Sequence, residues 1–109
     1  MRTLLAIAIL SLLCAAPAAF GRTQAEVDHE RALKSEQELD RIKHLVARDA
    51  KRMERAKKAG DAAGEAHWRN EMEKHHAQAK QQKRKVNADR KRAERSEERE
   101  RLARESKSK

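Results

Sequence analysis

The stretch Ala59-Gly60-Asp61-Ala62-Ala63-Gly64 decides the fold, because it holds two of the three glycines in the chain. Lys57 and Lys58 precede it with the positive charge that suits the C-terminal end of a helix. Gly60 can adopt the left-handed conformation that ends a helix, and the Asp61 carboxylate can cap the helix that follows. The stretch therefore predicts a helix–helix turn over 59–64. The alternative is one continuous helix through both glycines, each costing about 1 kcal/mol relative to alanine.

Both flanks of this turn have the composition of helices. Ala, Glu, Lys, Arg and Gln dominate them, and no proline follows Pro17. Acidic residues also recur four positions before basic ones, a spacing that stabilises a helix surface. These pairs are Glu30 with Lys34, Glu54 with Lys58, Glu97 with Arg101, and Glu100 with Arg104. We therefore predict an all-α fold: a long, charged antiparallel hairpin with helices at about 24–58 and 62–105 and a frayed C-terminal tail at 106–109.

Two rows of residues, spaced alternately three and four apart, mark the faces on which the helices would meet. The first row is Leu39, Ile42, Val46, Asp49, Met53 and Ala56. The second row is Trp68, Met72, His75, Ala79, Gln82, Val86, Asp89 and Ala93. Folding about Asp61 brings the rows together and places Met53 near Trp68. The sequence thus predicts a coiled-coil hairpin with a thin, alanine-rich core, which self-association into a homo-oligomer would strengthen.

Large apolar residues are scarce after the first 21 positions. They are Val27, Leu33, Leu39, Ile42, Leu45, Val46, Met53, Trp68, Met72, Val86 and Leu102. Such a composition, with 41% charged residues, is also typical of disordered chains. Disorder is therefore the alternative to the hairpin, which helix propensity and charge pairing favour.

Residues 1–21 have the composition of a secretory signal peptide. One basic residue precedes an apolar run at 4–13, and small residues follow the run. Cleavage before Arg22 is favoured over cleavage before Ala19, because the composition turns abruptly charged there. An uncleaved membrane anchor is the alternative, but the run is shorter than the roughly 20 residues that a bilayer requires, and Pro17 interrupts its end.

Cleavage would release a basic protein outside the reducing cytosol. The sequence has 27 basic and 18 acidic residues, a formal net charge of +9, and its one cysteine, Cys14, would leave with the signal peptide. We expect a periplasmic or secreted location, in a bacterium. If the N-terminal segment is not a signal peptide, a cytosolic nucleic-acid-binding protein is the alternative.

Residues 80–95 contain eight basic and two acidic residues. On a helix these charges surround the axis and attract polyanions through charge and counterion release. The stretch has no aromatic residue for base stacking and no bulky apolar face for insertion into a bilayer. The residues predicted to contact a polyanion are Lys83, Arg84, Lys85, Arg90, Lys91 and Arg92. Expected partners are an acidic envelope polymer, an anionic membrane surface or a protein; a solvated surface that aids solubility is the alternative.

A second candidate site lies early in the second predicted helix. His67, Glu71 and His75 recur at four-residue spacing, and neighbours at this spacing can chelate Zn, Cu or Ni. Residues eight apart lie about 12 Å from each other along the axis, so a further ligand must come from elsewhere. Asp49 on the facing helix is the candidate. Alternatively, His75 is a polar residue that sets the register of the two helices, and His67 is solvated.

The sequence contains no catalytic motif. It has no glycine-rich phosphate loop, no serine with plausible triad neighbours, and no cysteine nucleophile after residue 21. Its composition cannot enclose the preorganised, partly dry cleft that catalysis needs. The sequence predicts a small exported, non-enzymatic helical protein, an adaptor or envelope-surface protein that binds acidic polymers or partners through a basic helix. A metal-binding or metal-sensing hairpin is the alternative function.

Overall fold

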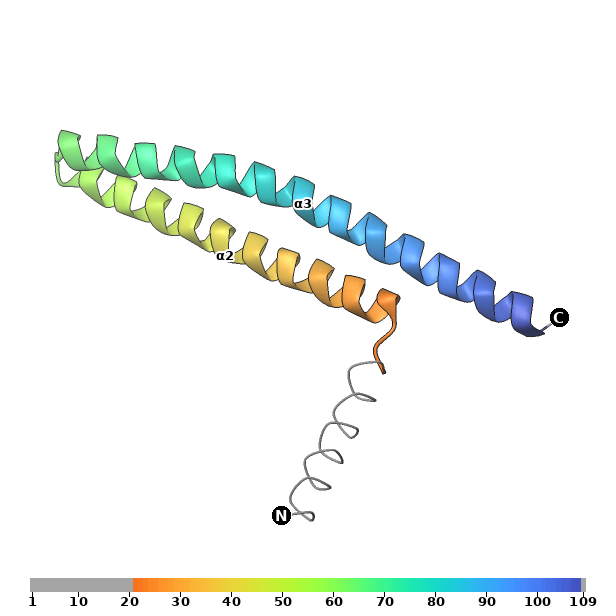
Figure 1. Ribbon diagram of the computed structural model, residues 1–109. Helices are drawn as coiled ribbons and strands as arrows, with labels where there is room; N and C mark the ends of the chain where they lie inside the picture. The colour runs from red at the N-terminus through yellow and green to blue at the C-terminus, as the bar shows by residue number, and fades with distance from the viewer. Residues whose placement is uncertain (1–20, 109) are drawn as a thin grey trace, which may run out of the picture.

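The computed structural model describes residues 21–108, which form two long α-helices. Helix α2 spans Gln24–Lys58 and helix α3 spans Ala62–Ser108, and the two lie side by side in opposite directions (Figure 1). The predicted all-α fold is confirmed. The predicted signal peptide lies outside the described residues, apart from Gly21. Neither of the two described helices combines the length and the hydrophobicity that a membrane span requires.

The turn between the helices has the local chemistry that its sequence predicts. Gly60 has a φ of 72°, in the left-handed region. Its N–H donates to the carbonyl of Lys57 at 3.1 Å, and the Asp61 N–H donates to the carbonyl of Ala56 at 2.9 Å. Together these bonds form the Schellman arrangement that ends α2. Oδ1 of Asp61 accepts from the Gly64 N–H at 2.9 Å and so caps α3. The alternative of one continuous helix is wrong.

The start of α2 is capped from two sides. Thr23 has an extended backbone, and its hydroxyl accepts from the N–H of Glu26 at 3.2 Å. The N–H of Ala25 donates to Oε1 of Glu100, on α3, at 3.1 Å. This carboxylate also suits the positive end of the α2 dipole. Glu100, which the sequence pairs with Arg104, thus serves the other helix instead.

The charge pairs along the helices only partly follow the four-residue spacing. Glu30 pairs with Lys34 at 3.3 Å, and it is the one of the four predicted pairs that forms within residues 21–108. Glu97 instead pairs with His29 across the hairpin. The spacing rule considers one helix alone, whereas Glu97 and Glu100 find their partners on the facing helix.

The second helix is longer than predicted. The sequence predicts fraying from Ser106, but α3 continues through Ser108. Arg101 pairs with both Glu98 and Glu105, and the Ser108 hydroxyl donates to the carbonyl of Glu105 at 2.9 Å. These local contacts support the last turns of α3, which extend past the start of α2 (Figure 1).

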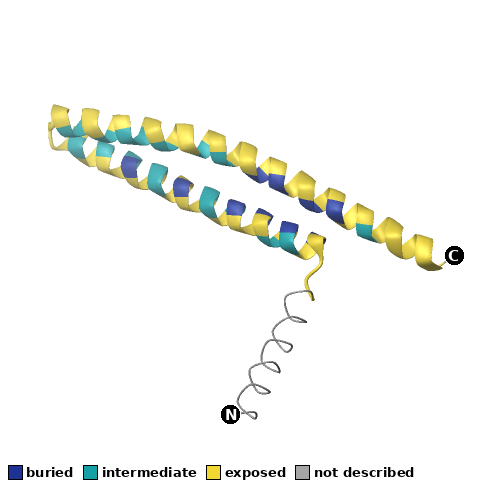
Figure 2. Cartoon of the chain, in the orientation of Figure 1, coloured by how far each residue is buried: buried dark blue, intermediate teal, exposed yellow. Residues whose placement is uncertain are grey.

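The two helices meet along a seam of buried and half-buried residues that recur every three or four positions (Figure 2). Every residue of the two predicted rows belongs to this seam. The same spacing continues further than predicted, toward the start of α2 and the end of α3. The added positions are Ala25, Asp28, Ala32, Ser35, Ser96 and Glu100. The seam is therefore longer and more polar than the two predicted rows.

Polar pairs across the seam fix the register of the hairpin. They are Asp28–Ser96, Ser35–Asp89 and Asp49–His75. In the first two, the serine hydroxyl donates to the carboxylate. All three pairs are centred on residue 62, so the register is constant along the hairpin. A slip of one helix along the other would leave buried carboxylates without partners, which strongly disfavours other alignments.

Candidate functional site on the second helix

Helix α3 carries the six basic residues that the sequence predicts to contact a polyanion, and all six are exposed. With 3.6 residues per turn, they point in three directions, in pairs seven residues apart. The pairs are Arg84 with Lys91, Lys83 with Arg90, and Lys85 with Arg92. Helix α3 thus presents positive charge on its outer face and on both flanks.

On the flanks, acidic groups of α2 lie beside some of these cations. Nε of Arg90 forms an ion pair with Oε1 of Glu36. Lys85 lines a groove together with Glu38. The hydrogen bond from Arg41 is the main cause that lowers the pKa of Glu38, and the charge of Lys85 contributes to it. The hairpin itself therefore compensates part of the charge on the flanks.

Four cations, from the outer face and the adjoining flank, surround a shallow hollow. Its lining residues are Arg84, Asn87, Ala88, Lys91, Arg92 and Arg95. None of them is acidic, and none of the four cations forms an ion pair with another residue of 21–108. Arg95 is missing from the predicted contacts, although it lies four residues beyond Lys91 on the same helix face. The spacing of Arg84, Lys91 and Arg95 would have identified it.

The surface of α3 is more positive than its composition indicates. Asp89 is the one acidic residue between Glu73 and Glu94. It is buried in the seam, where it accepts a hydrogen bond from Ser35. About 30 Å of helix therefore exposes lysines and arginines but no carboxylate of its own.

The seam also holds Asp28, whose charge is linked to the basic face. The hydrogen bond from Ser96 is the main cause that lowers the pKa of Asp28, while burial raises it. The side chain of Gln24 and the charges of Arg31 and Arg92 lower this pKa further. The interior of the hairpin thus favours the ionised carboxylate.

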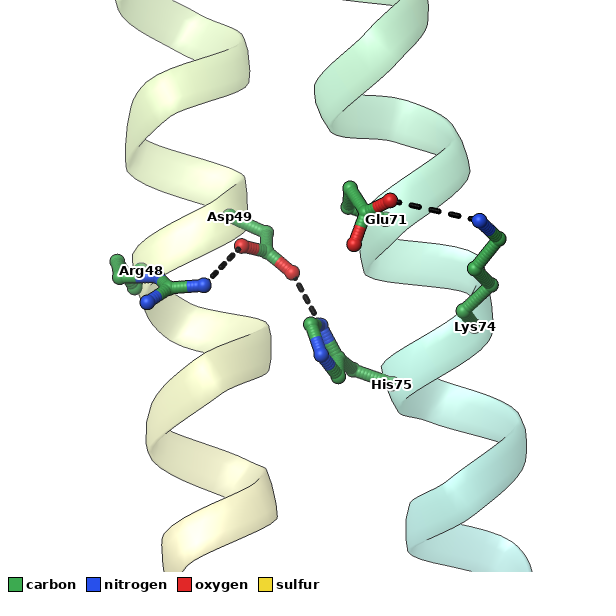
Figure 3. A network of polar contacts seen from close by, with 5 residues as sticks. All are labelled: Arg48, Asp49, Glu71, Lys74 and His75. Carbon is green, nitrogen blue, oxygen red and sulfur yellow. Dashed lines mark hydrogen bonds and ion pairs between the residues drawn. The ribbon is translucent and has the colours of Figure 1, made fainter.

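Of the four residues predicted as metal ligands, Asp49 and His75 come together, as the sequence predicts, whereas His67 and Glu71 do not join them. Nδ1 of His75 lies 2.5 Å from Oδ2 of Asp49 (Figure 3). Glu71 instead pairs with Lys74 at 3.4 Å, and His67 is exposed. Among the described residues, no group of three or more His, Cys, Asp or Glu side chains is close enough to hold a metal ion. The predicted Zn, Cu or Ni site is therefore not assembled, because ligands on one helix face spread along the axis.

Near the turn, the one tryptophan forms a contact between the helices. The Arg52 guanidinium lies over the Trp68 ring, 4.5 Å from its centroid. The ring of His67 packs edge-on against Trp68, with the centroids 4.8 Å apart. The sequence predicts Met53 near Trp68. In the structure Arg52 contacts the ring, and Met53, the residue after Arg52, is half-buried. A cation over an indole stabilises the closed end of the hairpin.

No known family model, no curated protein and no solved structure matches the chain significantly. The chemistry of the exposed α3 surface is therefore the guide to function.

Proposed function

We propose that this is a small exported, non-enzymatic protein that binds an acidic polymer through the basic surface of α3. The proposal rests on the distribution of charge in the segment between Glu73 and Glu94. Its eight basic residues are all exposed, whereas its one acidic residue is buried. Concentrated charge of one sign attracts a polyanion over a distance, and binding releases the counterions of the polymer.

A polymer suits this surface better than a small ligand. The cations extend over about 30 Å of helix, so a chain of anionic groups can contact many of them at once. Residues 80–95 contain no aromatic residue, and Val86, their bulkiest apolar residue, is 3% exposed in the seam. Neither base stacking nor insertion into a bilayer is therefore available. Binding must be mainly electrostatic.

Export is the second part of the proposal, and the composition of residues 1–21 supports it. The test is the intact mass of the natively expressed chain in the exported and cytosolic fractions of its own cell. A mass lacking about 21 residues, found outside the cytosol, supports export. Full-length protein in the cytosol contradicts it and makes nucleic acid the first polymer to test.

Binding is tested with the chain from Arg22 onward and fluorescently labelled heparin as the acidic polymer. Fluorescence anisotropy gives the dissociation constant between about 50 and 200 mM salt. We expect affinity to fall at least about tenfold over this range, because binding releases counterions. Salt-insensitive binding would contradict an electrostatic mechanism.

A pair of charge-matched variants locates the surface. In the first, six residues of α3 become glutamine: Lys83, Arg84, Lys85, Arg90, Lys91 and Arg92. In the control, six exposed residues of α2 become glutamine: Lys34, Lys43, Lys51, Arg55, Lys57 and Lys58. The α3 variant should lose most of the binding and the α2 variant much less. Equal losses would show that net charge, not the α3 surface, is responsible.

A further inference from the structure

The hollow on α3 is lined by two neutral residues, Asn87 and Ala88, which we call its floor, and by four cations, which we call its rim. Asn87 and Ala88 lie about one turn after Arg84 and about one turn before Lys91 and Arg92. One turn is about 5.4 Å along the axis, a distance that long arginine and lysine side chains can span. Cationic groups from both sides can therefore converge on one anion above the floor.

The cations around this hollow repel one another. Lys91 and Arg95 are four residues apart, and Arg92 and Arg95 are three apart; like charges at these spacings destabilise a helix. On the flank, by contrast, Arg90 is paired with Glu36. An anion in the hollow would relieve this repulsion, which no ion pair within residues 21–108 relieves. The hollow is therefore a better anion site than the flank that carries Arg90.

We infer that this hollow is a phosphate subsite, seating a phosphate group between Arg84 on one side and Lys91 and Arg92 on the other. The inference rests on the proposed function and narrows the acidic polymer to one that carries phosphate. Three of the four rim cations are arginines, and a guanidinium donates two parallel hydrogen bonds to one anion.

The geometry of the anion explains the preference. A phosphate group is tetrahedral, and even an inner unit of polyphosphate, with two free and two bridging oxygens, presents edges in different directions, so arginines from opposite sides of the hollow can each bind a separate edge. A carboxylate has two oxygens in one plane and accepts the paired hydrogen bonds of one guanidinium group. The positive charge of the hollow should therefore increase its affinity for a carboxylate polymer, but the placement of arginines on opposite sides should not.

The test compares linear polyphosphate with polyglutamate carrying the same number of charges, at neutral pH and equal salt. The chain from Arg22 onward should bind polyphosphate at least about tenfold more tightly, a typical discrimination for one well-formed bidentate pair. Equal affinity for both polymers overturns the phosphate subsite but leaves the proposed function standing. Absence of binding to either polymer, and to heparin, overturns the proposed function itself.

A matched pair of variants locates the subsite. Ala88→Glu places a carboxylate on the floor of the hollow, at an exposed position where glutamate is a good helix former. Ala66→Glu adds the same charge at another exposed position of α3, about 27 Å along the axis from Arg84. This exceeds the Debye length of about 8 Å at physiological salt. Only Ala88→Glu should weaken polyphosphate binding about tenfold or more; equal effects of both variants overturn the location.

A charge-preserving variant separates the effect of bidentate hydrogen bonding from the effect of positive charge. Replacing Arg84, Arg92 and Arg95 together by lysine keeps every positive charge and removes the planar donors. Polyglutamate binding should stay within about twofold, while the preference for polyphosphate should disappear. A preference that survives this change overturns the role of the arginines. Circular dichroism checks that all variants keep the helix content of the wild type.

A last arm of the experiment identifies the source of the phosphate. Vesicles containing phosphatidic acid present a phosphate group, as a monoester, on a membrane surface. Tighter binding to polyphosphate than to these vesicles, at equal accessible phosphate, supports a polymer. Tighter binding to the vesicles overturns the polymer and assigns the phosphate to a lipid headgroup.

Discussion

Asp49 and His75 meet across the hairpin, with Oδ2 of the aspartate 2.5 Å from Nδ1 of the histidine. The Asp49 side chain is fully buried, and Nη2 of Arg48 lies 3.4 Å from its other oxygen (Figure 3). An ionised carboxylate only accepts hydrogen bonds, so Nδ1 of His75 carries the hydrogen of this contact. The pair therefore gives a buried polar side chain a hydrogen-bond partner, without which it would destabilise a thin seam.

Replacing His75 by alanine should lower the free energy of unfolding by about 1–3 kcal/mol, because it leaves one oxygen of a buried carboxylate unpaired. Urea unfolding followed by circular dichroism measures the loss. His76→Ala, at the next and exposed position, is the control and should change stability by no more than about 0.5 kcal/mol. A double-mutant cycle with Asp49→Ala should give a coupling of about 0.5–3 kcal/mol; a coupling near zero would contradict the contact.

The cost of replacing Gly60 should depend on its backbone conformation and not on contacts of the new side chain. A Cβ at this position would meet no atom within 4 Å, but the φ of 72° strains residues with L side chains. Gly60→Ala should therefore destabilise the hairpin by about 1 kcal/mol. Gly60→Asn should lose less, because asparagine adopts the left-handed conformation more readily. Equal losses in urea unfolding would show that the left-handed conformation is not what matters.

The turn and the middle of the seam could be predicted because their signals are local. Gly60 and Asp61 carry their own capping chemistry, and Leu39, Ile42 and Val46 show the three- and four-residue spacing through large apolar side chains. The start of the seam could not be found in that way, since small and polar residues such as Asp28 carry no hydrophobic signal. Continuing the spacing backward from Leu39, whatever the residue type, would have reached it.

The candidate site was predictable in outline but not in its electrostatics. Exposure of the basic residues follows from their positions outside the α3 row. Which of them are compensated depends on the facing helix: Arg90 meets Glu36 only because the two helices adopt this register. The burial of Asp89 likewise depends on Ser35 across the seam. Of the predicted metal ligands, Asp49 and His75 meet across the hairpin as the sequence predicts, but no third ligand joins them among the described residues.

Glu100 should stabilise α2 although it belongs to α3. Its carboxylate accepts from the Ala25 N–H and lies at the positive end of the α2 dipole. Glu100→Ala should therefore lower the free energy of unfolding by about 1 kcal/mol, as the loss of a helix cap does. Glu98→Ala, which removes an exposed ion pair with Arg101, is the control and should lose a few tenths of a kcal/mol. Hydrogen exchange at Ala25 should quicken in the first variant alone.

The hairpin should lose stability in acid partly through Asp28. Its folded-state pKa lies below the ordinary value, chiefly because of the hydrogen bond from Ser96. A lowered pKa stabilises the fold at pH values above the ordinary aspartate pKa of about 3.9, and this contribution disappears as the pH falls through the folded-state pKa.

Unfolding free energies measured from about pH 6 downward should therefore decline most steeply below about pH 4. Asp28→Asn should flatten this decline without abolishing it, because Arg22 and Arg41 also lower the pKa values of Glu30 and Glu38 by hydrogen bonding to them. Ser96→Ala removes the donor but keeps the carboxylate, so it should also flatten the decline. An unchanged slope in both variants would contradict the role of the Asp28–Ser96 pair.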